Sequence, residues 1–154
     1  MNLTLIQFGK TKDRWLQEGI NEYLKRLSPY HKISILELPD ASLKANQDEE
    51  AVRSKEAASA MRHIQPQDSL ILLDEAGELK SSLQFSQFLS NLSSSKRSIF
   101  LIGGVFGVHA ELKARATHII SLSPLTFTHR MARLILIEQI YRATMIAQNR
   151  SYHI

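Results

Sequence analysis

A carboxylate and a guanidinium lie four residues apart in the most apolar stretch of the sequence. The stretch from Arg130 to Ala147 includes an unbroken apolar run at 134–137 and is predicted to form one long helix. Glu138 and Arg142 interrupt it at a spacing that places both side chains on one face. An exposed pair of this kind is an ordinary helical ion pair, whereas a buried pair is a poor stabiliser compared with apolar residues. Because so apolar a helix should be buried on all faces or packed against another subunit, we interpret the pair as functional.

Two glycines and a later loop are candidate ligand-binding segments. Residues 99–102 are predicted to form a strand, so Gly103 and Gly104 stand at its carboxyl end, where open α/β sheets bind ligands. Their missing side chains would let a ligand reach the backbone. A further apolar run at 118–122 gives way to a loop at 123–128, whose N–H and C=O groups could hold an adenine or an amide.

Apolar runs alternate with helical stretches along the whole chain. Apolar residues recur at three- and four-residue steps after the first and third runs, as they do in amphipathic helices. This alternation predicts an α/β fold with a mostly parallel sheet of five to six strands and helices on both faces. The polar segment from Pro39 to Asp48 is expected to be a loop, and residues 1–154 are expected to form a single domain. The predicted strands are 3–8, 33–38, 69–73, 98–102 and 118–122.

Composition excludes several classes of function. The 154 residues contain no cysteine, which excludes disulfides, thiolate metal sites and a cysteine nucleophile, and no His, Asp or Glu spacing resembles a metal site. The start lacks a cationic signal segment and no apolar run reaches about 18 residues, so we expect a cytoplasmic protein without a membrane partner. The net charge is +4, and residues 129–154 hold four arginines against one acid, which favours an anionic partner at that end.

Five motifs follow one another along the chain: LLDEAG at 72–77, IGGVFG at 102–107, SLSPLTFTH at 121–129, RLILIEQIYRA at 133–143 and a terminal Tyr-His at 152–153. In this order they closely resemble the RlmH family of SPOUT-class methyltransferases. The opening LTLIQFGK and the helix WLQEGINEYLKRL are also similar to that family, so the resemblance covers the full length. The sequence departs from the family pattern at Val105, Phe106 and Thr128.

The resemblance implies a function, a fold and a site. The implied activity is the transfer of a methyl group from S-adenosylmethionine to N3 of a pseudouridine in large-subunit ribosomal RNA, within the assembled ribosome and without a metal. The implied fold has a C-terminal trefoil knot and forms a homodimer through the last helix. The chain end is implied to complete the catalytic site, which consists of Glu138, Arg142, Tyr152 and His153. The implied S-adenosylmethionine contacts are Leu73, Gly103, Gly104, Gly107, Leu122, Ser123, Pro124, Leu125, Thr126, Phe127 and Thr128.

Such a reaction has two chemical requirements. The imide nitrogen must lose its proton, for which His153 is the first candidate base and Glu138 the second. The negative charge left on the flanking carbonyl oxygens needs cations or N–H donors, and Arg142 and His153 are available. Two alternatives stay open: a SPOUT methyltransferase that acts on another RNA, such as transfer RNA, and a non-catalytic RNA- or nucleotide-binding α/β module in which Glu138 and Arg142 only set helix packing.

Overall fold

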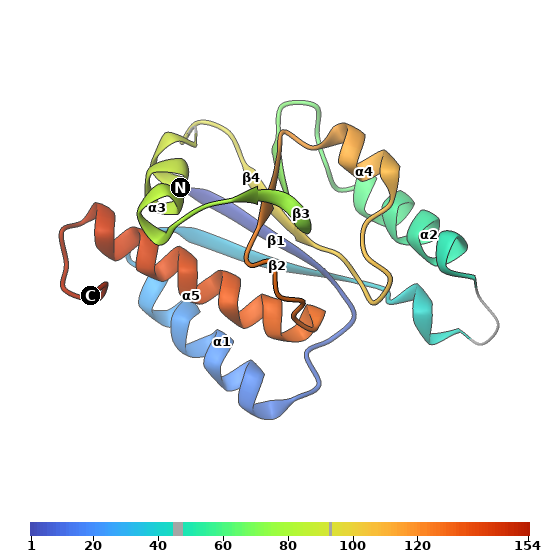
Figure 1. Cartoon of the computed structure of the whole chain (residues 1–154), viewed down its shortest axis with the longest axis horizontal. Helices are drawn as coiled ribbons and strands as arrows, with labels where there is room; N and C mark the ends of the chain where they lie inside the picture. Colours follow the sequence, from blue (N-terminus) through green and yellow to red (C-terminus); the bar gives the residue numbers. More distant parts are fainter. Residues whose placement is uncertain (45–47, 93) are drawn as a thin grey trace.

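A five-stranded parallel sheet with the order β2-β1-β4-β3-β5 forms the centre of the molecule in the computed structural model (Figure 1). The structure describes residues 1–44, 48–92 and 94–154. The prediction of an α/β fold with a parallel sheet of five to six strands is confirmed. The strands are β1 (Asn2–Phe8), β2 (Lys32–Leu38), β3 (Ser69–Leu79), β4 (Ser98–Ile102) and β5 (His118–Ser121).

Helices cover both faces of the sheet, as predicted. Helices α1 (Arg14–Leu27), α3 (Ser82–Asn91) and α5 (His129–Ala147) pack on one face, and α2 (Glu49–Met61) and α4 (Ala110–Arg115) pack on the other. Adjacent residues of a strand therefore enter different cores: Leu5 joins the cluster with α1, α3 and α5, whereas Ile6 joins the cluster with α2 and α4. The expected loop from Pro39 to Asp48 includes a short 3-10 helix at Ala41–Leu43, and its residues 45–47 lie outside the described part of the chain.

Helix α5 runs antiparallel to the strands. Near its start, the buried Arg133 donates from Nη2 to the carbonyl of Phe8, 2.7 Å away at the carboxyl end of β1. Near its end, Thr144 Oγ1 lies 2.9 Å from Nε2 of His31, just before the amino end of β2. These contacts are eleven residues apart, about 16 Å along a helix axis. Figure 1 accordingly shows the C-terminus on the same side of the molecule as the N-terminus.

Strand β3 is longer than the sequence predicted, because the chain leaves the sheet and returns to it. Leu73 and Glu78 both pair with Ile120 of β5, so residues 74–77 form an extra excursion between them. A Cβ on Gly77 would lie 2.6 Å from the carbonyl carbon of Ile120, so only glycine fits there. The acidic residues of this excursion resemble a turn in the sequence, which is why the predicted strand ended at Leu73.

Candidate active site

The four predicted catalytic side chains lie in one hydrogen-bonded cluster near the end of α5. Arg142 donates from Nη2 to Glu138 Oε1 at 2.6 Å. The hydroxyl of Tyr152 donates to the same oxygen at 3.0 Å. Arg142 also donates from Nη1 to Nδ1 of His153 at 3.2 Å. The structure thus places the chain end beside the helical pair of Glu138 and Arg142.

Aromatic contacts hold this chain end against the helix. Asn149, with φ 53°, adopts the left-handed conformation and reverses the chain after α5. The ring of Tyr152 then packs edge-on against Tyr141 with 4.8 Å between centroids, and its hydroxyl lies 3.0 Å from that of Tyr23 on α1. The guanidinium of Arg142 lies 4.8 Å from the centre of the Tyr152 ring. A terminal segment that would otherwise fray is therefore fixed by specific contacts.

Neighbouring groups shift the pKa values of Arg142 and Tyr152. The carboxylate of Glu138 raises the pKa of Arg142, which stays cationic. Burial, followed by the hydrogen bonds to Tyr23 and Glu138, raises the pKa of Tyr152, which stays a neutral phenol. Since a guanidinium can only donate, Nδ1 of His153 accepts its hydrogen bond, and the imidazole bears its proton on Nε2. The site therefore presents a fixed cation beside a neutral imidazole.

The residues predicted to bind S-adenosylmethionine gather at the other end of the sheet. Leu73 pairs with Ile102 of β4 on one side and with Ile120 of β5 on the other. Gly103 and Leu122 follow these two strands, so they continue from neighbouring strand ends at the same edge as Leu73. Leu73 and the ends of β4 and β5 therefore lie beside one another in the sheet.

The glycine turn after β4 has a different reason for its composition than the sequence suggested. A Cβ on Gly103 would lie 2.9 Å from Val108, and one on Gly104 would lie 2.6 Å from Oε1 of Glu56. Val108 and Glu56 therefore fill the space that side chains on these two glycines would need. Gly107 closes the turn by donating to the Gly104 carbonyl at 3.1 Å, and its φ of +81° is the one here that requires glycine.

The loop at 123–128 is shaped by two of its own hydroxyls. Ser123 Oγ accepts a hydrogen bond from the Leu125 N–H at 3.0 Å. Thr128 Oγ1 accepts from the Met131 N–H at 3.2 Å, so the departure from the family pattern at this position is a helix N-cap. Between them the loop is open to solvent, with Leu125 72% and Phe127 36% exposed. The exposed members are Pro124, Leu125, Thr126, Phe127 and Thr128.

The predicted catalytic cluster and the predicted ligand loops lie near opposite ends of α5. Helix α5 begins beside the loops and carries Arg142 nine residues beyond Arg133, about 14 Å toward the amino ends of the strands. Figure 1 shows the chain end and the turn after β4 toward opposite ends of the strands. Within one chain the two groups are therefore separated along the length of α5.

A buried acid that the sequence argument missed lies behind the glycine turn. Glu56 of α2 is only 3% exposed, and its Oε2 accepts a hydrogen bond from the Ala41 N–H at 3.3 Å. Its Oε1 has no hydrogen-bond partner in the part of the chain that the structure describes. Burial, together with the nearby charge of Asp40, raises the pKa of Glu56 to about 7. The signal was present in the sequence, because Val52, Glu56 and Ala60 form a buried row at four-residue steps.

This raised pKa predicts a specific pH dependence of stability. Between the ordinary value of 4.5 and about 7, folded Glu56 keeps a proton that the unfolded chain has released, so the free energy of unfolding falls as pH rises through this window. The Glu56→Gln variant should lack this fall, which thermal melts from pH 4.5 to 8 will show. Glu49→Gln, an exposed change on the same helix, should follow the wild type. Parallel curves for wild type and Glu56→Gln would contradict the shift.

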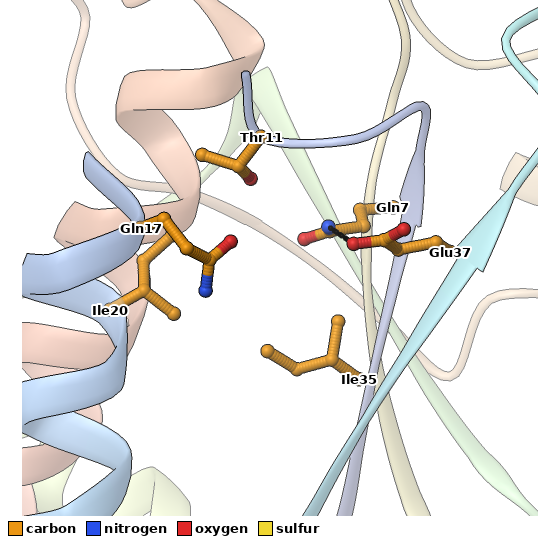
Figure 2. Close-up of a pocket in the computed structure, with 6 residues that line it drawn as sticks. All are labelled: Gln7, Thr11, Gln17, Ile20, Ile35 and Glu37. Carbon is orange, nitrogen blue, oxygen red and sulfur yellow. Dashed lines mark hydrogen bonds between the residues drawn. The ribbon is translucent and has the colours of Figure 1, made fainter. Parts of the chain in front are cut away.

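A separate cavity of about 330 Å³ opens between α1 and strands β1 and β2. Figure 2 shows Gln17 and Ile20 of α1 on one side of it and Ile35 and Glu37 of β2 on the other, with Gln7 donating to Glu37 at 3.4 Å. No predicted site residue lines this cavity. Within the described ranges, no cluster of His, Asp and Glu could hold a metal ion, and no helix is long and apolar enough to cross a membrane.

The fold is a parallel α/β sheet, a class in which ligands bind beyond the carboxyl ends of the strands, where the predicted loops lie. The family model described as "Predicted SPOUT methyltransferase" matches residues 1–153, and the chain belongs to this family of methyltransferases, whose fold contains the expected C-terminal knot. Two relatives, from Carboxydothermus hydrogenoformans and Desulforamulus reducens, are each 40% identical over 99% of both chains. Both are named "Ribosomal RNA large subunit methyltransferase H", so the resemblance to the RlmH family is confirmed.

Proposed function

We propose that this chain is a cytoplasmic homodimer that transfers a methyl group from S-adenosylmethionine to N3 of a pseudouridine in large-subunit ribosomal RNA, within the assembled ribosome. Full-length similarity to two relatives with that type of name supports the substrate class. The single observation that carries the chemistry is the cluster around Glu138, in which a fixed cation and a neutral imidazole lie 3.2 Å apart.

The loops at the carboxyl edge of the sheet offer apolar and backbone groups that match the chemistry of the methyl donor. S-adenosylmethionine supplies a methyl group that is already activated on a sulfonium. The exposed apolar side chains of Leu125 and Phe127 offer surface to an adenine, and the backbone of the loop is accessible beside them. Leu73 pairs with Ile102 and Ile120, the residues that come shortly before the two loops on β4 and β5. We assign the binding of the donor to this edge.

Glu138 organises the catalytic cluster and leaves the proton transfer to His153. Its Oε1 accepts from Arg142 and Tyr152, and its Oε2 accepts from Gln139 at 2.6 Å, so both oxygens are occupied. When a carbonyl oxygen of the imide takes the Arg142 donor, Nδ1 of His153 is free to accept the imide proton. Arg142 then stabilises the negative charge on the carbonyl oxygen while N3 attacks the methyl group.

Methyl transfer to defined RNA substrates tests this proposal. The enzyme is incubated with labelled S-adenosylmethionine and, in parallel, with intact ribosomes, isolated subunits, naked ribosomal RNA and transfer RNA, and the product is mapped by mass spectrometry. We expect one methylated pseudouridine in the large-subunit RNA of intact ribosomes. Label in transfer RNA alone would assign another RNA substrate, and binding of the donor without transfer to any RNA would identify a non-catalytic module.

A further inference from the structure

The glycine turn and helix α2 enclose a carboxyl oxygen that has no partner. Oε1 of Glu56 would lie 2.6 Å from a Cβ on Gly104, so it points at the turn through the space that this glycine leaves. The oxygen is buried and has no hydrogen-bond partner within the described part of the chain. A buried polar atom without a partner destabilises the folded protein, so such atoms in native proteins are usually satisfied by a water, an ion or a ligand.

Among the residues that the structure describes, no cation acts on Glu56. Asp40, the titratable neighbour that acts on Glu56, is itself an acid and adds negative charge. Arg53, one turn earlier on α2, pairs with Glu50 at 3.1 Å and donates to the carbonyl of Phe106 at 3.3 Å. Arg53 therefore already anchors the turn to α2, and the free oxygen of Glu56 is not needed for that purpose.

We propose that Glu56 is a ligand-binding residue of the S-adenosylmethionine site, whose Oε1 accepts a hydrogen bond from an O–H or N–H group of the bound molecule next to Gly104. Two parts of S-adenosylmethionine have this chemistry, the ribose hydroxyls and the ammonium group of the methionine part. The assignment rests on the proposed function. It also explains Gly104, because any side chain there would displace the carboxyl group from the turn.

The proposal predicts opposite effects on stability and on binding. Glu56→Met keeps the length of the side chain but removes the buried carboxyl group with its unpaired Oε1. It gives up only the long hydrogen bond that Oε2 accepts from the Ala41 N–H at 3.3 Å, so the variant without ligand should melt at a higher temperature than the wild type. Its affinity for S-adenosylhomocysteine, measured by calorimetry on the full chain, should fall by roughly 10-fold or more, as expected for the loss of a hydrogen bond to a charged group. A merely structural carboxyl group would instead give a lower melting temperature and unchanged affinity, which would overturn the assignment.

A second ligand separates the two sources of the hydrogen bond. 5′-Methylthioadenosine has the ribose hydroxyls but lacks the amino acid part. An equal loss of affinity for both ligands in Glu56→Met supports a contact with the ribose, and a loss for S-adenosylhomocysteine alone supports a contact with the ammonium group. Unchanged affinity for both ligands overturns the assignment and leaves the proposed function intact. A wild-type chain that binds neither ligand overturns the proposed function and the assignment together.

Two further variants keep the test decisive. If Glu56→Met does not fold, Glu56→Gln replaces it, since it keeps the shape of the side chain and removes the charge, and its affinity for S-adenosylhomocysteine should also fall by several-fold. Glu49→Gln, on the exposed side of the same helix, should bind both ligands as the wild type does. Equal affinity in Glu56→Gln, Glu49→Gln and wild type would overturn the assignment.

Discussion

Replacing Arg142 by alanine is expected to lower the turnover number by about 100-fold or more, while the affinity for S-adenosylmethionine stays within a few-fold. This pattern is expected when a hydrogen-bond donor that stabilises negative charge in the transition state is removed. Arg142 lies in the catalytic cluster with Glu138 and His153, far along α5 from the loops that we assign to the methyl donor. Single-turnover methylation of ribosomes and calorimetry with S-adenosylmethionine measure the two quantities separately.

Arg26 provides a matched control for this experiment. It also pairs with a glutamate four residues away, Glu22, and its guanidinium lies 5.2 Å from the centre of the Tyr23 ring, close to the cluster but outside it. Arg26→Ala should therefore keep nearly full turnover. If Arg142→Ala kept full turnover as well and only melted at a lower temperature, Arg142 would be a structural ion-pair partner.

The sheet and its helices were predictable because they follow from periodicity. The five strands are short apolar runs between amphipathic stretches, and four of them begin and end within two residues of the predicted bounds. The exception, β3, depends on the excursion at 74–77, which exists because Gly77 lies against the backbone of Ile120. That contact joins residues far apart in the sequence, and no local pattern encodes it. Likewise, the knot follows from family membership and not from any periodicity.

The candidate site was predictable in part. The four-residue spacing of Glu138 and Arg142 fixed their pairing, because helical geometry is local. The return of Tyr152 to the cluster depends on a left-handed turn at Asn149 and on a distant partner, Tyr23, so only the resemblance indicated it. Glu56 was missed although the same reasoning applied to its helix, where it lies in the row of Val52 and Ala60.

The distance between the catalytic cluster and the ligand loops has a consequence for the oligomer. An antiparallel α5 places the cluster near the amino ends of the strands and the loops at the carboxyl ends. If the proposed homodimer pairs the α5 helices of two chains, the tail of one chain can reach the loops of the other. The proposed active site is therefore composite, with the loops of one chain and Arg142, Tyr152 and His153 of its partner.

A mixture of two inactive variants is expected to regain activity. In Arg142→Ala the loops are intact and the cluster is broken. Thr126→Arg breaks the loops instead, since a cationic side chain on an exposed loop position repels the sulfonium of S-adenosylmethionine without disturbing the core. After subunit exchange, each heterodimer holds one site with intact loops from the first variant and an intact cluster from the second. Because about half of the dimers are heterodimers and each has one working site of two, statistical mixing should give up to about one quarter of the wild-type activity.

The controls make the outcome unambiguous. Thr126→Arg must keep the wild-type melting temperature and the wild-type mass in solution, and calorimetry must show that it binds no S-adenosylmethionine. Native mass spectrometry of differently labelled chains must show that heterodimers form. If each cluster served the loops of its own chain, neither site of the heterodimer would be whole, and the mixture would stay as inactive as its components. Heterodimers that form without any gain in activity would therefore exclude the composite site, whereas recovery that rises with the fraction of heterodimer would assign the cluster to the partner's loops.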